Sequence, residues 1–149
     1  MDDDELEVTE SVTRGAARAL VAMGYAPLRE VSLANGRRAD LLGIDAHGKL
    51  AIVEVKSSRA DFTSDRKWHE YLEFCDEFGF AVNAAFPSEL LPVAHGLIIA
   101  DRFQGELVRP LSQQALSAAR RKAMLIRLAR LGALRLFTLA DPEGAGPGY

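Results

Sequence analysis

One apolar segment near the middle of the chain carries two charged residues. In the run Leu50–Lys56, alternation of side chains along a strand places Glu54 and Lys56 on one face, and Val53 and Val55 on the other. A carboxylate and an ammonium on a buried strand are costly unless they pair, bind a metal or line a cleft. Glu54 and Lys56 are therefore the first candidates for chemistry in this chain.

A second carboxylate, that of Asp40, lies one predicted strand earlier in the chain. Pairing of Ile44 with Lys49 across the intervening turn defines one register of the two strands. In that register Asp40 lies opposite Val53, one residue from Glu54. A register shifted by one residue places Asp40 directly opposite Glu54, and directly opposed Cβ atoms are about 4.5–5.5 Å apart. Both registers bring two carboxylates together.

Two carboxylates are the ligands that a hard cation such as Mg²⁺ or Mn²⁺ prefers, and the backbone carbonyl of Val55 would supply a further oxygen. A divalent ion lowers the pKa of a bound water and so generates a nucleophile near neutral pH. Lys56 would orient that water or stabilise negative charge on a phosphate. Asp40, Glu54 and Lys56 together therefore predict hydrolysis of phosphodiester bonds.

The same residues also have a purely structural interpretation, as a buried ion-pair cluster that serves only the fold. We favour the functional interpretation because a buried ion pair is often no better for stability than apolar residues of similar volume. The three histidines have neither the spacing nor the shared face of a metal site. Cys75 is the only cysteine, which excludes an intramolecular disulfide and a thiolate cluster for zinc.

Alternating and helically periodic segments surround these candidates. Asn35-Gly36 is the strongest hairpin signal in the sequence, and a second turn at residues 45–48 leads into the strand of Glu54. The pattern predicts an α/β (α+β) fold with a central mixed β-sheet flanked by helices, in one domain over residues 1–140, with a disordered tail over 141–149. In chain order we predict a helix over 8–23, strands over 28–33, 38–44 and 50–56, a helix over 64–75, strands over 78–83, 96–100 and 106–109, and a helix over 113–131.

The helix predicted over residues 64–75 follows the strand of Lys56 after a short loop, and Ser64 is its expected N-cap. Asp65, Lys67 and Tyr71 would line a cleft beside Lys56, or else form a solvated helix face with a partly buried tyrosine. The apolar face of this helix, which we assign to the core, consists of Trp68, Tyr71, Leu72 and Cys75.

The pattern of Asp40 followed by Glu54-Val55-Lys56, after a helix and a strand, resembles the PD-(D/E)xK nuclease superfamily, with Ala39 in place of the motif's proline. A closer resemblance is to the MmcB-type family of DNA-repair endonucleases, and it covers roughly residues 9–131. The segments that carry it are 38–42, 54–58 and 61–68, followed by Tyr71, Cys75-Asp76, Phe78 and 96–101.

The resemblance implies a PD-(D/E)xK fold and Mg²⁺- or Mn²⁺-dependent cleavage of DNA in repair. Asp40 and Glu54 would bind the metal, and Lys56 would assist the reaction. Glu10, on the first helix, matches an acidic residue that many members place beside the metal, although an early helical Glu also interacts favourably with the helix dipole. The alternatives are a catalytically inactive DNA-binding or adaptor domain on the same fold, and a purely structural or protein-interaction domain.

The net charge of −3 hides an uneven distribution of charge. Six acidic residues lie within the first ten positions, whereas residues 109–135 contain seven basic residues and no acidic one. Basic side chains on a helix face are often only solvated, but here they are also candidates for contacts with the DNA backbone. The candidate DNA contacts are Arg37, Arg38, Ser57, Arg59, Lys67, Tyr71, Arg120 and Arg121.

Other classes of protein are disfavoured by what the sequence lacks. No apolar run approaches the roughly 18 residues of a membrane span, and the acidic first residues differ from a basic targeting peptide, so we expect a cytoplasmic protein. Walker loops, dinucleotide fingerprints and nucleophile elbows are absent from the sequence. A chain of 149 residues offers little surface to grip a DNA duplex, so we also expect a homodimer or a repair-protein partner.

Overall fold

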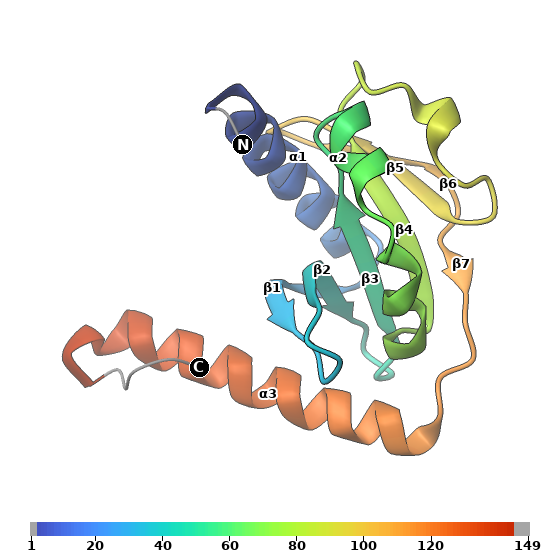
Figure 1. Ribbon diagram of the computed structural model, residues 1–149. Coiled ribbons are helices and arrows are strands. Elements are labelled where there is room, and N and C mark those ends of the chain that lie inside the picture. Colours follow the sequence, from blue (N-terminus) through green and yellow to red (C-terminus); the bar gives the residue numbers. More distant parts are fainter. Residues whose placement is uncertain (1–2, 145–149) are drawn as a thin grey trace. The chain divides into compact units, whose positions relative to one another are not determined.

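The computed structural model describes residues 3–144, which form two compact units, one ending at Leu116 and the other beginning at Ser117. The first unit contains one long helix and a seven-stranded sheet (Figure 1). Its elements are α1 (Asp3–Ala22), β1 (Ala26–Ser32), β2 (Arg38–Ile44), β3 (Leu50–Val55), α2 (Arg59–Ser64), the 3₁₀ helix η1 (Trp68–Phe74), β4 (Glu77–Val82), the 3₁₀ helix η2 (Ser88–Leu90), β5 (Gly96–Ala100), β6 (Gly105–Arg109) and β7 (Ser112–Gln113).

The strands form one mixed sheet in the order β1-β2-β3-β4-β5-β6. β1, β2 and β3 make an antiparallel meander, β3, β4 and β5 run parallel, and β6 pairs antiparallel with β5. β7 pairs with the first residues of β4. The predicted α/β architecture, a central mixed sheet flanked by helices, is therefore confirmed.

One face of the sheet is covered by α1. Val12 and Leu20 of this helix are fully buried against strand residues that include Val53. The helix approaches the end of β5 closely because Gly15 has no side chain. A Cβ atom at that position would lie 2.0 Å from the carbonyl oxygen of Asp101. The alternation of β3 therefore directs Val53 towards α1 and leaves Glu54 for the opposite face.

α1 begins earlier than the helix predicted over residues 8–23. Its first turn contains Asp3, Asp4 and Glu5, and acidic groups at this end interact favourably with the helix dipole. It ends before Gly24, the predicted stop, whose φ of +95° is a conformation that glycine adopts easily.

The opposite face of the sheet carries an aromatic cluster beneath α2 and η1. Phe78 and Phe80 of β4 are fully buried, and their ring centroids lie 5.9 and 5.3 Å from that of Trp68. Phe62 of α2 packs edge-on against Phe80, and Tyr71 of η1 stacks on Phe78. The cluster fixes the segment between β3 and β4 against the sheet.

The single helix predicted over residues 64–75 is wrong. The chain forms α2 earlier, and the N-cap is Ser58 rather than Ser64, because Ser58 Oγ accepts the N–H of Asp61 at 3.1 Å. α2 then ends at Asp65, whose backbone is extended and whose carboxylate makes contacts outside the helix. Hydrogen bonds of the Ser58 hydroxyl and the Asp65 carboxylate thus set both ends.

The second half of that predicted helix is the 3₁₀ helix η1. A 3₁₀ helix repeats every three residues, so its inward side chains are Trp68, Tyr71 and Phe74. Tyr71 and Phe74 are buried, and so is Cys75 directly after the helix. The predicted core face is confirmed for Tyr71 and Cys75, whereas Trp68 and Leu72 are only partly buried.

The second unit consists mainly of α3, which spans Ala118–Ala140 rather than the predicted 113–131. It begins after the N-cap Ser117, whose Oγ accepts the N–H of Arg120 at 3.1 Å. Gln113, the predicted first residue, belongs instead to β7. Pairing with β4 therefore delays the start of the helix.

The tail predicted over residues 141–149 is described only in part. Pro142–Gly144 form a short 3₁₀ helix, and residues 145–149 lie outside the described residues. The expectation of a single domain over residues 1–140 stays a prediction.

The two outer strands of the sheet, β1 and β6, are both irregular. β1 contains Pro27, which has no backbone N–H, and Glu30, whose φ of +52° is unfavourable for a residue with a side chain. β6 has five residues, and its pairing with β5 changes register between Leu97 and Ile98.

Candidate active site

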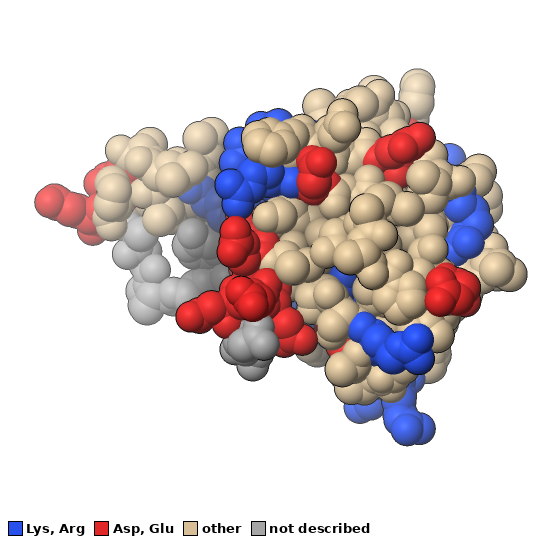
Figure 2. Space-filling view, turned by 90° about the horizontal axis from the view of Figure 1, so that it is seen from above, with Lys and Arg blue, Asp and Glu red and all other residues tan. Residues whose placement is uncertain are grey.

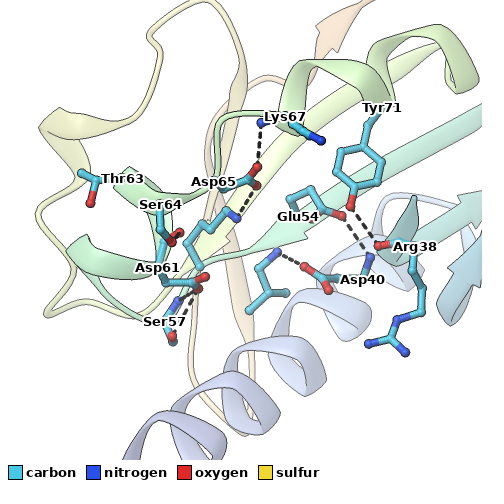
Figure 3. Close-up of polar contacts among 12 residues, drawn as sticks. Arg38, Asp40, Glu54, Ser57, Asp61, Thr63, Ser64, Asp65, Lys67 and Tyr71 are labelled. Carbon is cyan, nitrogen blue, oxygen red and sulfur yellow. Dashed lines mark hydrogen bonds and ion pairs between the residues drawn. The ribbon is translucent and has the colours of Figure 1, made fainter. Parts of the chain in front are cut away.

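The first two carboxylates of the candidate site come from adjacent strands. The pair Ile44–Leu50 sets the register of β2 and β3, and its continuation places Asp40 beside Glu54. Glu54 Oε1 accepts the N–H of Asp40 at 3.0 Å, and Asp40 Oδ2 accepts the N–H of Val55 at 2.8 Å (Figure 3). Of the two registers considered from the sequence, the structure has the one that brings the carboxylates closest.

Glu54 is buried and Asp40 is partly buried, and the negative charge of Asp40 disfavours ionisation of Glu54. Glu54 is only 4% exposed. Burial, and then the negative charge of Asp40, raises the pKa of Glu54 well above its ordinary value. Burial also raises the pKa of Asp40, although the hydrogen bond from Val55 opposes this rise. The pair therefore favours the uptake of a proton or a cation.

Lys56 lies at the end of β3 and is tied to the segment that follows α2. Its ammonium is 2.6 Å from Asp65 Oδ2, and both side chains are largely buried. Burial alone would raise the pKa of Asp65, but hydrogen bonds from Lys56 and from the N–H of Lys67 outweigh it and lower that pKa. From the sequence, Asp65 was predicted to lie near the cleft, but its ion pair with Lys56 was not predicted.

A third carboxylate near Asp40 was not among the predicted site residues. Asp61 Oδ2 accepts the N–H of Ser57 at 2.9 Å and its hydroxyl at 3.2 Å. The negative charge of Asp61 contributes to the raised pKa of Asp40, after burial. The spacing of Ser58 and Asp61, typical of a capping box, was the available signal for it. Ser57, a predicted DNA contact, is therefore engaged within the protein.

Tyr71, on η1, lies near the carboxylates of Asp40 and Glu54. Its hydroxyl donates to the carbonyl oxygen of Arg38 at 2.9 Å (Figure 3). Burial, and then the charges of Glu54 and Asp40, raises the pKa of Tyr71, which keeps the phenol protonated. Tyr71 thus ties η1 to the start of β2 beside the two carboxylates.

The predicted DNA contacts are distributed over several elements. Arg37 Nε pairs with Glu70 Oε2 at 2.9 Å, so this guanidinium already has a carboxylate partner. Arg120 and Arg121 belong to α3 in the second unit. Three predicted contacts in the first unit have exposed side chains: Arg38, Arg59 and Lys67.

Glu10, the other acidic residue predicted beside the metal, pairs with a basic residue of β1. It lies on α1 and forms a two-pronged ion pair with Arg29 of β1, with one bond of 3.0 Å and one of 2.5 Å. The hydrogen bond from Arg29 lowers the pKa of Glu10, whose side chain is 62% exposed. Its assignment beside a metal stays a prediction.

The donor set around Asp40 and Glu54 suits a hard divalent cation. Two carboxylates converge there, and burial is the main cause of the raised pKa of both, with the negative charge of Asp40 adding to the rise at Glu54. A bound cation would favour the ionised form of both groups. The N–H of Val55 points to Asp40, and in a strand the carbonyl of the same residue points to the same side. Oxygen ligands of this kind, completed by water, are those of Mg²⁺ sites.

A family model described as DNA repair protein MmcB-like matches residues 1–143. The chain belongs to the MmcB-like family. A solved structure, described as a protein of unknown function from Silicibacter pomeroyi, is similar to this MmcB-like chain with 44% sequence identity and a TM-score of 0.90. The similarity covers 95% of this chain and 97% of that one. No curated protein matches the chain.

Family membership confirms the resemblance to MmcB-type proteins. The match includes both units of this MmcB-like protein, since it extends from the first residue into the segment after α3. Within residues 3–144, no helix is long and apolar enough to span a membrane.

The stability of this MmcB-like protein without metal should fall as the pH rises above the ordinary range of a carboxyl group. The pKa values of Asp40 and Glu54 are higher in the folded protein than in the unfolded chain. At a pH between the unfolded and the folded pKa, the folded protein therefore binds more protons than the unfolded chain. The contribution of these two groups to the free energy of unfolding is complete at a pH below their unfolded pKa values. It is lost as the pH rises through their folded pKa values. Thermal unfolding in EDTA from about pH 5 to about pH 9 measures this slope. His95, whose pKa is lowered by burial, contributes an opposite slope below its ordinary value. A stability that rises or stays level from about pH 7 to about pH 9 in wild type contradicts the prediction.

Proposed function

We propose that this protein is a Mg²⁺- or Mn²⁺-dependent DNA nuclease of the PD-(D/E)xK type that acts in DNA repair. The observation that carries the proposal is the convergence of Asp40 and Glu54 at the ends of β2 and β3, with the buried ammonium of Lys56 two residues further on. The description of the family as DNA repair proteins supports DNA as the substrate.

In this proposal each residue has a distinct role. Asp40, Glu54 and the carbonyl of Val55 would hold the divalent ion, which when bound lowers the pKa of a water and polarises a phosphoryl oxygen. Lys56 brings a positive charge to the place where negative charge develops on the phosphate. Tyr71, protonated and anchored to β2, limits the access of water to the two carboxylates.

DNA would be held through contacts with individual basic side chains near the candidate site. On the face shown in Figure 2, basic and acidic side chains are interspersed and form no single basic band. Arg38 precedes Asp40 by two residues, Arg59 is the first residue of α2, and Lys67 follows α2 by three residues; all three are exposed. Contacts of this kind with phosphates give an affinity that falls steeply as salt rises. The expected homodimer or partner protein stays a prediction, and it would extend this limited surface.

A second candidate function is a DNA-binding or adaptor domain without catalysis. One observation favours it: among residues 3–144, no group of three or more His, Cys, Asp or Glu side chains is arranged to hold a metal ion. The nuclease proposal therefore depends on two carboxylates, a carbonyl and water as ligands. The adaptor interpretation predicts DNA binding that does not respond to divalent ions.

The test is cleavage of labelled single-stranded, duplex and branched DNA with Mg²⁺ or Mn²⁺. We expect wild type to cleave at least one substrate, and Asp40→Asn and Lys56→Met to lower the rate by at least about 10²-fold. Asn at position 40 still accepts the N–H of Val55, so the fold is preserved. Glu73→Gln, a change of the same type on the exposed side of η1, is the matched control and should cleave normally.

Each outcome separates the two candidates. Binding of DNA without cleavage of any substrate, unaffected by EDTA, supports the adaptor domain. Cleavage that persists in Asp40→Asn would place the active site elsewhere in the chain.

A further inference from the structure

The ammonium of Lys56 interacts with carboxylates from several elements. Its positive charge opposes the rise in the pKa of Asp40 and of Glu54. Asp65 lies at the break between α2 and η1 (Figure 3). The direct contact, of 2.6 Å, is with Asp65. A single ammonium is thus shared unequally among three carboxylates.

Asp65 is itself held in place. Its Oδ1 accepts the N–H of Lys67 at 2.9 Å, which leaves Oδ2 directed at Lys56. The Asp65 side chain is 18% exposed and that of Lys56 is 6% exposed, so the ion pair is poorly screened by water. A short α2 that ends at Asp65 is what brings this carboxylate to the end of β3.

Removal of the Asp65 charge would leave the ammonium without its direct partner, and the remaining carboxylates of the site are those of Asp40, Glu54 and Asp61. A buried ammonium seeks a counter-charge, so Lys56 would turn towards Asp40 and Glu54. Their negative charge, which suits them to a divalent cation, would then be neutralised internally. The same movement would withdraw Lys56 from a phosphate bound at the site.

We propose that Asp65 is a positioning residue that holds Lys56 apart from Asp40 and Glu54, which keeps both carboxylates available to a divalent cation and the ammonium available to the substrate. The inference rests on the proposed function, because it concerns the same site. It assigns a role to the break between α2 and η1, where an uninterrupted helix would not place a carboxylate against Lys56.

The first experiment measures Mn²⁺ binding by calorimetry in a double-mutant cycle of Asp65→Asn and Lys56→Met. We expect Asp65→Asn to weaken binding about tenfold in the wild-type background, a coupling within the range for residues in contact. In the Lys56→Met background the same change should have little effect, since no ammonium remains to compete. An equal loss in both backgrounds would overturn the inference, because Asp65 would then act only through its own charge.

The second experiment measures steady-state cleavage. Asp65→Asn should lower kcat with little change in KM, because Lys56 acts on the reacting phosphate more than on DNA binding. Asp65→Glu, which restores the charge on a longer side chain, should recover part of kcat and of the Mn²⁺ affinity. Glu73→Gln is again the charge-matched control on the same segment. Thermal unfolding of each variant shows that it is folded.

The outcomes distinguish this inference from the proposed function. Binding of Mn²⁺ and cleavage by wild type, with Asp65→Asn unchanged in both, overturns the role of Asp65 alone. Failure of wild type to bind Mn²⁺ overturns the proposed function and this inference together. Loss of both properties in Asp65→Asn and in Asp65→Glu alike contradicts positioning by charge.

Discussion

Glu54→Gln should stabilise the metal-free protein and at the same time abolish cleavage. The Glu54 side chain is buried, and its pKa is raised well above the ordinary value by burial and then by Asp40. Gln has nearly the same shape, and its amide oxygen still accepts the N–H of Asp40. We therefore expect the free energy of unfolding at pH 8 in EDTA to rise, because the substitution removes a buried charge that lies beside Asp40.

The same substitution removes a carboxylate from the donor pair. Cleavage should fall by at least about 10³-fold, and Mn²⁺ should no longer protect the protein against thermal unfolding. The stability gain should vanish near pH 4, where the carboxyl group is protonated in both states. If the variant is less stable than wild type at pH 8, the buried charge of Glu54 does not destabilise the metal-free fold, and the prediction is contradicted. The expected result, a more stable variant that does not cleave DNA, would show that the site lowers the stability of the fold.

Phe78→Ala should have the largest effect on stability, a loss of about 3–5 kcal/mol in the free energy of unfolding. Phe78 is fully buried at the centre of the aromatic cluster, with ring centroids of Trp68 and Phe80 at 5.9 and 5.2 Å. Tyr71 stacks on the same ring, so the change should also loosen η1 beside the site. Chemical denaturation at neutral pH measures the loss.

The control for Phe78→Ala is Phe103→Ala, since Phe103 lies between β5 and β6 with 69% of its surface exposed. That variant should lose less than about 1 kcal/mol. Losses of similar size in the two variants would mean that the aromatic cluster is not part of the stabilising core.

The identity of the two carboxylates could be predicted from the sequence, but their register could not. Leu41 and Leu42 are both apolar and β3 is apolar throughout, so alternation did not distinguish one register from the other. The turn between β2 and β3 determines the register. Asp45 accepts the N–H groups of His47 and Lys49, both at 2.8 Å, and this loop makes Leu50 the partner of Ile44.

The parts that were missed depend on partners distant in the sequence. Propensity favoured a single helix over residues 64–75, but the pair of Asp65 with Lys56 on another element ends α2 early. The ion pair of Glu10 with Arg29, from a strand that follows the turn after α1, was likewise not predicted. Local pattern carries no information about either contact.

The irregular outer strands of the sheet bear on how this protein behaves at high concentration. A straight edge strand exposes backbone groups that can pair with a strand of another molecule and so nucleate aggregation. In β1, Pro27 offers no donor and the backbone at Glu30 is turned out of the extended conformation. β6 is only five residues long and its register is broken. Both edges are thus poor templates for further strands, so we expect any self-association of the chain to use side-chain surfaces and not a continuous intermolecular sheet.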